Sequence, residues 1–209
     1  MNVLITGGLG QIGSLVAELL LSRGDNVCVV DNLATGRREH LSEHENLKVC
    51  IDTISDKNKL EEIFKTFEPE VVVHTAASYK DPEDWYSDSL TNCVGGANIA
   101  FLSKKYNVRR IIYYQTALCY GLKPEENPIT LSHKRNPSGS SYAISKTANE
   151  LYIELSDVAE SRFPEIGELC FFTYTASFPE KYPFYDRRPL VYVMDFQGDK
   201  MLGGNLHYL

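Results

Sequence analysis

The sequence predicts an α/β protein: a doubly wound parallel sheet followed by a small β-rich C-terminal segment. Strand-like and helix-like segments alternate along the first two-thirds of the chain, and the strand-like segments are continuous apolar runs. Such runs are typical of strands that are buried on both faces of a parallel sheet. Right-handed crossovers between parallel strands then place helices on both sides of the sheet.

The first elements are short and have clear ends. Residues Asn2–Thr6 form an apolar run that ends in glycines, which predicts the first strand. Apolar residues at helical spacing over 11–23 predict the first helix, and Gly24 is a typical C-terminal cap. Two further buried strands are expected at 26–30 and at Leu47–Ile51.

The alternation continues through the middle of the chain. An amphipathic helix is expected over 59–67, before a proline, and a fourth strand over 70–77. A long helix is expected over 89–107 despite two glycines, and a fifth strand over 110–116. The last helix of this part is expected to begin at residue 141 and to reach at least 154.

The character of the chain changes after about residue 157. Three strand-like segments, 168–174, 188–196 and 200–209, follow one another without a helix-length apolar pattern. A stretch rich in proline and aromatic residues separates the first two, and a tight turn joins the last two. We therefore expect one domain over 1–157 and a short β-rich segment over 158–209.

The composition is that of a soluble globular protein. The chain has 209 residues, of which 43% are hydrophobic and 23% charged, so it can bury one good-sized core. Its net charge of −7 argues against nucleic acid, because proteins that bind it usually carry a basic patch. The sequence has no polybasic cluster, charged leader or membrane-length apolar run, so we expect neither membrane contact nor a secretory signal.

The cysteines indicate a reducing compartment. They are odd in number and form no CxxC pair, and two of them lie in apolar strand-like runs, where a reduced cysteine acts as a small hydrophobe. The expected location is therefore the cytoplasm. The five cysteines are Cys28, Cys50, Cys93, Cys119 and Cys170.

A glycine-rich turn lies where the first strand meets the first helix. In TGGLGQIGS, Gly7, Gly10 and Gly13 form a GxxGxxG pattern, and with Gly8 the stretch also satisfies GxGxxG. Glycine allows a tight turn, close approach of the backbone to a pyrophosphate, and packing of helix on strand. The helix N-terminus supplies free N–H groups and positive dipole for the phosphates. Alone, such a cluster is also compatible with an ordinary βα turn.

An acidic residue strengthens the dinucleotide interpretation. Asp31 ends the second strand, roughly 20 positions beyond the last glycine, where a carboxylate can accept hydrogen bonds from ribose hydroxyls. A carboxylate there repels a 2′-phosphate and so favours NAD over NADP. Arg37 and Arg38 are nearby and favour a 2′-phosphate instead, but we expect the effect of Asp31 to dominate.

A candidate reactive pair lies on the last predicted helix. Tyr142 and Lys146 are four residues apart and therefore share a face of the helix. A free tyrosine, with a pKa of about 10, is a poor base at neutral pH, but a neighbouring ammonium lowers that pKa. Thr116, just after the fifth strand, is placed to hold a substrate oxygen at the ligand-binding edge of the sheet. By itself the Y-x-x-x-K spacing is also common in exposed helical pairs.

Together these motifs resemble a known family. The matching stretches are TGGLGQIG, DNLATGRREHL, HTAA, NCVGG, QTALCYG and YAISK, all within residues 1 to about 155. They are similar to the Rossmann-like extended short-chain dehydrogenases/reductases, specifically the NAD-dependent nucleotide-sugar epimerases and dehydratases. The resemblance implies oxidation of a sugar hydroxyl, followed by epimerisation, elimination or decarboxylation, with NAD as cofactor and a UDP-sugar as substrate.

The resemblance also implies roles for individual residues. The pyrophosphate would lie on the glycine turn, the adenosine ribose and adenine near Asp31, the nicotinamide-side ribose along the fourth strand, and the chemistry at Thr116, Tyr142 and Lys146. In chain order the implied cofactor residues are Gly7, Gly10, Gln11, Ile12, Gly13, Asp31, Asn32, Thr35, Gly36, Asp52, Thr53, Thr75, Ala76, Ala77, Asn92, Tyr142 and Lys146. The helices that carry Asn92 and Tyr142 form the dimer interface in this family, which implies a homodimer.

The C-terminal part departs from the family pattern. The family continues with a sixth strand and a substrate domain, and neither is recognisable here. From about Phe163 the chain instead loosely resembles β-rich segments of tailed-phage proteins, which implies a phage-encoded protein of the host cytoplasm. The alternative function is therefore an inactive NAD-binding or assembly module with an interacting β-rich tail. The aromatic residues of the C-terminal segment are expected to form a sheet core or an interface rather than a platform on which a sugar stacks. They are Phe171, Phe172, Tyr174, Phe178, Tyr182, Phe184 and Tyr185.

Four other polar residues are candidates for a functional site. His40 and His44 have a spacing that can bind metal, but no third ligand is indicated, and we expect a solvated face and no metal. His74 ends a buried strand and is expected to be a hydrogen-bonded structural histidine. Lys80 is expected either to meet a ribose or substrate phosphate or to be an ordinary exposed lysine.

Overall fold

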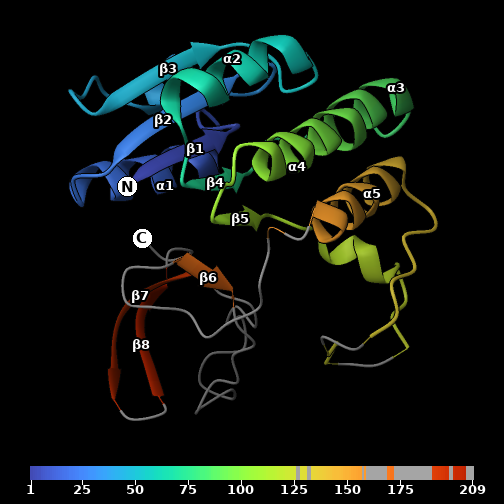
Figure 1. The fold of residues 1–209 in the computed structure, drawn as a ribbon. Coiled ribbons are helices and arrows are strands. Elements are labelled where there is room, and N and C mark those ends of the chain that lie inside the picture. The colour runs from blue at the N-terminus through green and yellow to red at the C-terminus, as the bar shows by residue number, and fades with distance from the viewer. Residues whose placement is uncertain are drawn as a thin grey trace. The chain divides into compact units, whose positions relative to one another are not determined.

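The protein was analysed as a computed structural model, which describes residues 1–125, 128–130, 133–156 and 158, and the backbone of three C-terminal strands. The chain divides into two compact units, Met1–Glu160 and Ser161–Leu209. Figure 1 labels the helices and strands of both units.

The first unit contains a five-stranded sheet in which every pair of neighbouring strands is parallel. The strand order is 3-2-1-4-5, so the chain moves outward from β1 in one direction and then returns to move outward in the other. The predicted doubly wound, Rossmann-like fold is thereby confirmed. The strands are β1 (Asn2–Thr6), β2 (Asn26–Asp31), β3 (Leu47–Ile51), β4 (Val71–His74) and β5 (Arg110–Tyr113).

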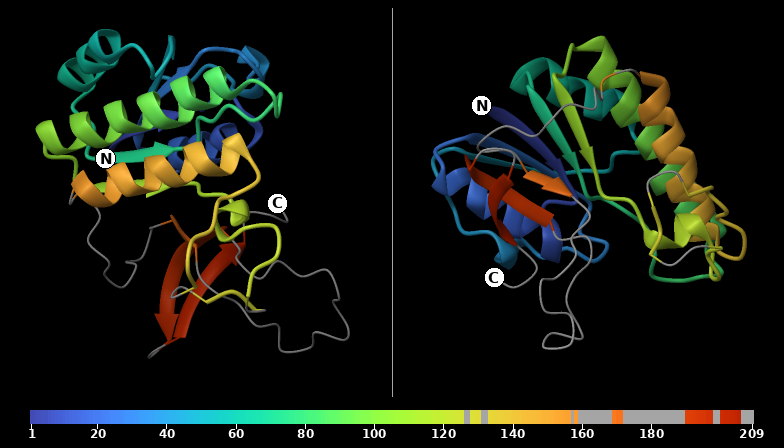
Figure 2. Two further views of the ribbon diagram at one scale, coloured as in Figure 1. Left: turned by 90° about the vertical axis from the view of Figure 1, so that its right-hand side faces the viewer. Right: turned by 90° about the horizontal axis from the view of Figure 1, so that it is seen from below.

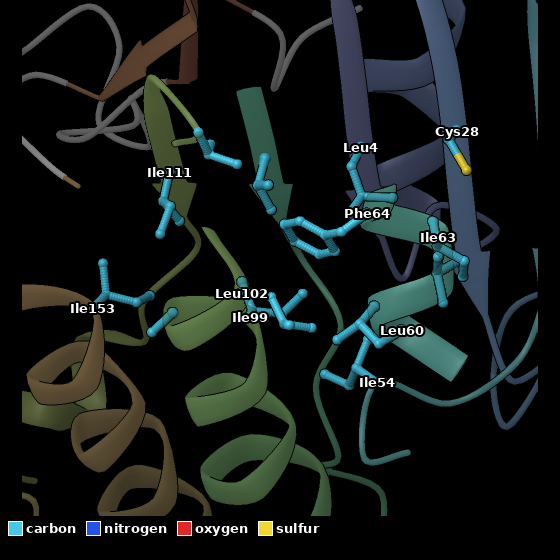
Figure 3. Close-up of a cluster of buried hydrophobic side chains, with 14 residues drawn as sticks. Leu4, Cys28, Ile54, Leu60, Ile63, Phe64, Ile99, Leu102, Ile111 and Ile153 are labelled. Atoms are coloured by element: carbon cyan, nitrogen blue, oxygen red, sulfur yellow. The ribbon is translucent and has the colours of Figure 1, made fainter. Parts of the chain in front are cut away.

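Helices cover both faces of the sheet (Figure 2). Helix α1 (Gln11–Ser22) packs on β1 and β2. On the other face, α2 (Lys57–Phe67), α4 (Gly96–Lys105) and α5 (Ser141–Ser156) share one apolar cluster with the sheet (Figure 3). In that cluster Phe64 of α2 and Ile99 of α4 meet Leu4 of β1, all with no exposed surface. Burial of side chains of this size is the main stabilising contribution to such a unit.

The long helix predicted over 89–107 differs in detail from the structure. The helical segment begins at α3 (Trp85–Asp88), because the Asp84 carboxylate caps the Ser87 N–H at 2.9 Å. A π-helical segment η2 (Ser89–Gly95) joins α3 to α4. The two glycines are packing positions: a Cβ at Gly95 would lie 2.6 Å from the Ile54 side chain, and one at Gly96 would lie 2.1 Å from the Asn149 side chain.

The ends of two strands also differ from the expectation. The fourth strand ends at His74 rather than at 77, and the fifth ends at Tyr113 rather than at 116. The residues that follow each strand form the loops that carry the candidate site. Short 3₁₀ segments, η1 (Arg38–His40) and η3 (Ala117–Tyr120), follow β2 and β5.

The second unit contains three antiparallel strands in the order 6-7-8. They are β6 (Leu169–Phe171), β7 (Leu190–Gln197) and β8 (Lys200–Asn205), and each overlaps one of the three segments predicted from the sequence. A bulge interrupts the register between Val193 and Asp195. The predicted turn at 198–199 and the side chains of the aromatic stretch lie outside the described residues.

Within the part of the chain that the structure describes, the helices are all too short or too polar to cross a bilayer.

Candidate active site

The glycine turn packs directly on the end of β4. Gly7 has φ +68°, and a Cβ there would lie 2.7 Å from the backbone of Ala76. A Cβ at Gly13 would lie 2.3 Å from the Gly7 carbonyl oxygen. Neither position accepts a larger residue without movement of backbone, so these glycines are required for the turn itself.

The turn leaves the start of helix α1 open. Gly10 is the N-cap residue without a side-chain cap, and the first helical bond runs from the Ser14 N–H to the Gly10 carbonyl at 3.0 Å. Gln11 and Ile12 are exposed, and within the described residues their backbone N–H groups have no hydrogen-bond partner. Unpaired N–H groups at the positive end of a helix dipole form a site suited to phosphate.

Asp31 holds the glycine turn in place. Its buried carboxylate accepts hydrogen bonds from the Leu9 N–H at 3.0 Å and from the Leu33 N–H at 2.8 Å. A Cβ at Gly36 would lie 2.7 Å from an oxygen of the same carboxylate, so glycine is needed beside it. Two bonds leave lone pairs of the carboxylate available for hydroxyl groups.

The loop after β2 is tied back to the same turn. Asn32 Oδ1 accepts from the Ala34 N–H at 3.1 Å, and Thr35 is exposed. The Nδ1 of His40 lies 2.7 Å from the Leu9 carbonyl oxygen. Because a carbonyl only accepts, Nδ1 of His40 carries the proton. This histidine contact has no sequence signal beyond the residue itself.

The histidine pair considered for metal does not form a metal site. His44 Nδ1 accepts from the Asn46 N–H at 3.1 Å, whereas His40 faces the glycine turn. Among the described residues, no group of three or more His, Cys, Asp or Glu side chains is arranged to hold a metal ion.

Asp52 and Thr53 lie next to Asp31. The Asp52 N–H donates to the Asp31 carbonyl at 3.0 Å, and the Asp52 carboxylate accepts from the Thr53 N–H at 2.8 Å. Lys59 forms an ion pair with Asp52 at 3.2 Å. Asp31, which the family resemblance assigns to the adenosine ribose, and Asp52 and Thr53, which it assigns to adenine, are thus neighbours in the structure.

The loop after β4 is fixed to β1. The Thr75 hydroxyl donates to the Thr6 carbonyl at 2.7 Å, and the Ala76 N–H donates to the Thr6 hydroxyl at 3.3 Å. Ala77 follows in the same loop, and Lys80, beyond it, is exposed. The loop therefore lies beside the glycine turn, which β1 also carries.

Asn92 links this loop to α5. Its Oδ1 accepts from the Ser78 N–H at 2.9 Å, and its Nδ2 donates to the Ser78 carbonyl at 2.9 Å and to the Ser145 hydroxyl at 3.0 Å. The residue has no exposed surface. All of its polar atoms are thus directed at protein groups, so Asn92 positions the wall of the site.

Tyr142 and Thr116 meet at the C-terminal edge of the sheet. Burial raises the pKa of Tyr142 above its ordinary value, Tyr79 and the Asp88 carboxylate raise it further, and the Thr116 side chain opposes this rise. The ring of Tyr79 lies 6.2 Å from that of Tyr142. The lowered pKa expected from the sequence is therefore not met.

Lys146, one turn after Tyr142 on α5, lies over an aromatic ring of β5. It is only 2% exposed, and its Nζ lies 4.2 Å above the centre of the Tyr113 ring. Burial lowers the pKa of Lys146 to about 7, against the opposing effect of the Glu150 carboxylate. At neutral pH this side chain is therefore close to half protonated.

The comparisons with known proteins decide the family. The model of the NAD dependent epimerase/dehydratase family matches residues 3–166. The chain belongs to this family. Among curated relatives, a putative UDP-glucose 4-epimerase of Methanocaldococcus jannaschii is 32% identical over 156 residues, which cover 73% of this chain and 50% of the relative. The UDP-glucose 4-epimerase of Halalkalibacterium halodurans is 33% identical over 72% of this chain and 44% of its own length.

Solved structures of similar fold agree with this assignment. The Bordetella bronchiseptica enzyme WbmH, in complex with NAD+, is 58% identical, with a TM-score of 0.73 over 75% of this chain and 52% of WbmH. WbmG of the same organism, in complex with NAD and UDP, is 44% identical, with a TM-score of 0.73 over 75% of this chain and 50% of WbmG. The chain thus spans about half the length of the epimerase relatives that it matches.

Two further residues that act electrostatically with Tyr142 carried no recognised sequence signal. Tyr113 lies beneath Lys146, and Asp88 has a buried carboxylate without a hydrogen-bond partner in the described part of the chain. His74 was expected to be structural, and this is confirmed: it is fully buried between Thr6 and Asn149, at 2.6 and 2.8 Å. Burial first, and Lys146 second, lower the pKa of His74 to about 3, so the ring is neutral.

Proposed function

We propose that this chain binds NAD and oxidises a hydroxyl group of a nucleotide sugar, as the first step of an epimerisation or dehydration. The observation that carries the proposal is the convergence of two sets of residues at one edge of the sheet. The glycine turn and the β4 loop are joined through Thr6, and the Thr116 side chain lies close enough to Tyr142 to lower its pKa. Family membership supports both the cofactor and the class of reaction.

The residues present fit a dinucleotide. The exposed N–H groups of α1 suit a pyrophosphate, and the Asp31 carboxylate, with lone pairs to spare, suits ribose hydroxyls. Bound NAD would supply the acceptor for the hydride that leaves the substrate carbon. The proposed cofactor residues are Gly7, Gly10, Gln11, Ile12, Gly13, Asp31, Asn32, Thr35, Gly36, Asp52, Thr53, Thr75, Ala76, Ala77, Tyr142 and Lys146, with Asn92 holding the wall behind them.

The chain's own residues would handle the substrate proton. Tyr142 receives the proton of the sugar hydroxyl as the C–H bond of the same carbon is broken, and Thr116 holds the oxygen by a hydrogen bond. Lys146 stabilises the phenolate form of Tyr142 through its positive charge. Because burial and the neighbouring Tyr79 and Asp88 raise the pKa of Tyr142, positive charge near the phenol is required before it acts as a base.

A UDP-sugar is the proposed substrate. Several relatives are UDP-glucose 4-epimerases, and WbmG was solved with NAD and UDP. The reducing compartment suggested by free Cys28, Cys50, Cys93 and Cys119 agrees with a cytoplasmic location, where we propose that the protein acts.

We also propose a homodimer formed through α4 and α5, which lie side by side (Figure 2). Several large apolar side chains on these helices and on η2 are exposed, which is unusual for a face that meets only water. They are Leu90, Val94, Phe101, Ile144, Leu151, Tyr152 and Leu155. Phe101→Glu is expected to convert a dimer to a monomer in sedimentation velocity. Leu122→Glu, which changes an exposed leucine away from these helices, is the control.

A second candidate function is an inactive NAD-binding or assembly module with an interacting β-rich tail. The raised pKa of Tyr142 favours it, since a raised pKa does not prepare Tyr142 as a base. The two candidates share the cofactor site and differ in the response to the sugar nucleotide.

Calorimetric titration separates the two candidates. The protein is titrated with NAD, and then with UDP-glucose in the presence of NAD, beside the Tyr142→Phe variant. Saturable binding of both ligands, with NADH absorbance that appears in the wild type and not in Tyr142→Phe, is the expected result. NAD binding without any response to UDP-sugars supports the module, and absence of NAD binding contradicts both candidates.

A further inference from the structure

The ammonium of Lys146 has an unusual environment. Its Nζ lies 4.2 Å above the ring of Tyr113, although the side chain is almost fully buried. Within the described residues this Nζ has neither a hydrogen-bond acceptor nor an ion-pair partner. A buried charge without a partner is strongly unfavourable, whereas an aromatic face offers a favourable electrostatic interaction. The ring of Tyr113 therefore stabilises the charge of Lys146.

Tyr113 is itself held at both ends. Its hydroxyl donates to the main-chain carbonyl of Lys146 at 2.9 Å, and its ring stacks on His74 with a centroid distance of 5.4 Å. Burial raises the pKa of Tyr113, so the hydroxyl keeps its proton and remains a donor. The same side chain thus contacts both the backbone and the charged end of one lysine.

We propose that Tyr113 is a positioning residue that provides a resting seat for the Lys146 ammonium, with its ring under the charge and its hydroxyl on the lysine backbone. The use of this lysine in turnover rests on the function proposed above, but the seat is a property of this chain alone. The chemistry is that of a buried cation–π pair.

The other titratable groups around the seat do not replace it. Glu150, one turn further along α5, shares its carboxylate with Arg135 at 3.0 Å and with Gln115 at 2.7 Å. His74, behind the ring, is neutral because burial lowers its pKa to about 3. Cys93 of η2 and Tyr142 of α5 complete the surroundings, and both act on the pKa of Tyr113.

The seat matters because the pKa of Lys146 lies near 7. Loss of the ring–cation attraction would lower this pKa further and leave most of the lysine neutral at physiological pH. A neutral lysine cannot stabilise a phenolate one helical turn away. In this way Tyr113 determines how much positive charge is available to Tyr142.

Fluorinated rings test the seat directly. Phenylalanines with zero, one, two, three and five ring fluorines are placed at position 113, because fluorine weakens the negative ring face at nearly constant size. The pKa of Lys146 is read by NMR of ¹³C-labelled lysine side chains, with the signal assigned from its loss in Lys146→Met. The expected result is a stepwise fall, totalling about one pH unit, as fluorines are added. A pKa that is the same across the series overturns the proposal.

The hydrogen bond from the Tyr113 hydroxyl to the Lys146 carbonyl is tested by a separate measurement. Tyr113→Phe removes it and keeps the ring, so amide hydrogen exchange in α5 around Lys146 is expected to become faster by at least about threefold. Unchanged exchange overturns that half of the proposal. The fluorine series at Tyr114, the next residue, is the control and leaves the Lys146 signal unchanged. Neither readout needs turnover, so an enzyme that proves inactive contradicts the proposed function without affecting the seat.

Discussion

Asn92 of the π-helical segment and Ser145 of α5 are joined by a buried hydrogen bond of 3.0 Å. The same asparagine holds both backbone groups of Ser78, in the loop after β4. Three chain segments that line the candidate site are thereby fixed by one side chain. π-helical turns occur often at functional sites, and this one places Asn92 where it reaches both partners.

Asn92→Ala is therefore expected to affect both stability and cofactor binding. It leaves the Ser78 N–H and carbonyl and the Ser145 hydroxyl without this partner, so the free energy of unfolding should fall by about 2 to 4 kcal/mol in urea denaturation. Because the loop after β4 is released, NAD affinity measured by calorimetry should fall as well.

Asn98→Ala provides the matched control for this change. Asn98 Nδ2 donates to the Ile54 and Ser55 carbonyls, away from the loop after β4. This variant should lose stability and keep NAD affinity. Equal losses of affinity in both variants would show that the effect of Asn92→Ala is only general destabilisation.

Two glycines of the first turn should respond differently to alanine. A Cβ at Gly13 meets backbone at 2.3 Å, whereas a Cβ at Gly10 meets only the Gly7 carbonyl oxygen, at 3.2 Å. Gly13→Ala should therefore lower the melting temperature clearly, because the turn must move. Gly10→Ala should fold with nearly the wild-type melting temperature and yet bind NAD at least about tenfold more weakly, since its methyl group narrows the approach to the N–H groups of α1. Wild-type affinity in Gly10→Ala would argue against a pyrophosphate at this position.

Much of the fold could be predicted because its strands and helices are determined by patterns within short stretches of the sequence. Each apolar run can be recognised within a short stretch of sequence. The glycine turn and Asp31 lie close together in sequence, and the Asp31 carboxylate accepts a hydrogen bond from the Leu9 N–H of that turn. The doubly wound arrangement of the sheet follows from the alternation of strands and helices along the chain. The long helix begins earlier than predicted, because its N-cap residue, Asp84, precedes the apolar pattern. The Thr116 side chain acts on the pKa of Tyr142, so these two residues lie near one another in the described structure.

The arrangement around Lys146 could not be predicted in the same way. The Y-x-x-x-K spacing indicates a shared helix face but not which neighbour the ammonium meets. That neighbour, Tyr113, lies on a strand 33 residues away, and His74 behind it lies on another. Such contacts depend on how α5 packs on the sheet, for which this sequence has no local signal.

His74 is expected to make the protein sensitive to acid. Its folded pKa is about 3, below its ordinary value of 6.5, so the unfolded chain binds more protons between these pH values. The stability that comes from burying the neutral ring is complete above about pH 6.5 and is lost as pH falls toward 3. His74→Asn should be less stable than wild type at pH 7 in urea denaturation, because Thr6 and Asn149 lose a partner.

The difference between wild type and His74→Asn should shrink on acidification from pH 6.5 to 4. A constant difference for His74→Asn would contradict a neutral buried ring.

Lys146→Met should stabilise the protein at neutral pH. The folded pKa of about 7 lies below the ordinary 10.5, so the unfolded chain binds more protons between these values and wild-type stability rises with pH across that window. Below about pH 7 the cost of burying the ammonium is complete. A methionine fills a similar volume without that charge, and the gain should be up to about 5 kcal/mol at pH 6.5, falling as pH approaches 10. Lys57→Met, which removes an exposed ammonium from the ring of Phe101, should change stability by less than about 1 kcal/mol at any of these pH values. If the gain from Lys146→Met did not fall with rising pH in urea denaturation, the lysine would not be a buried cation near its titration point, and its proposed availability to Tyr142 as a charge would be wrong.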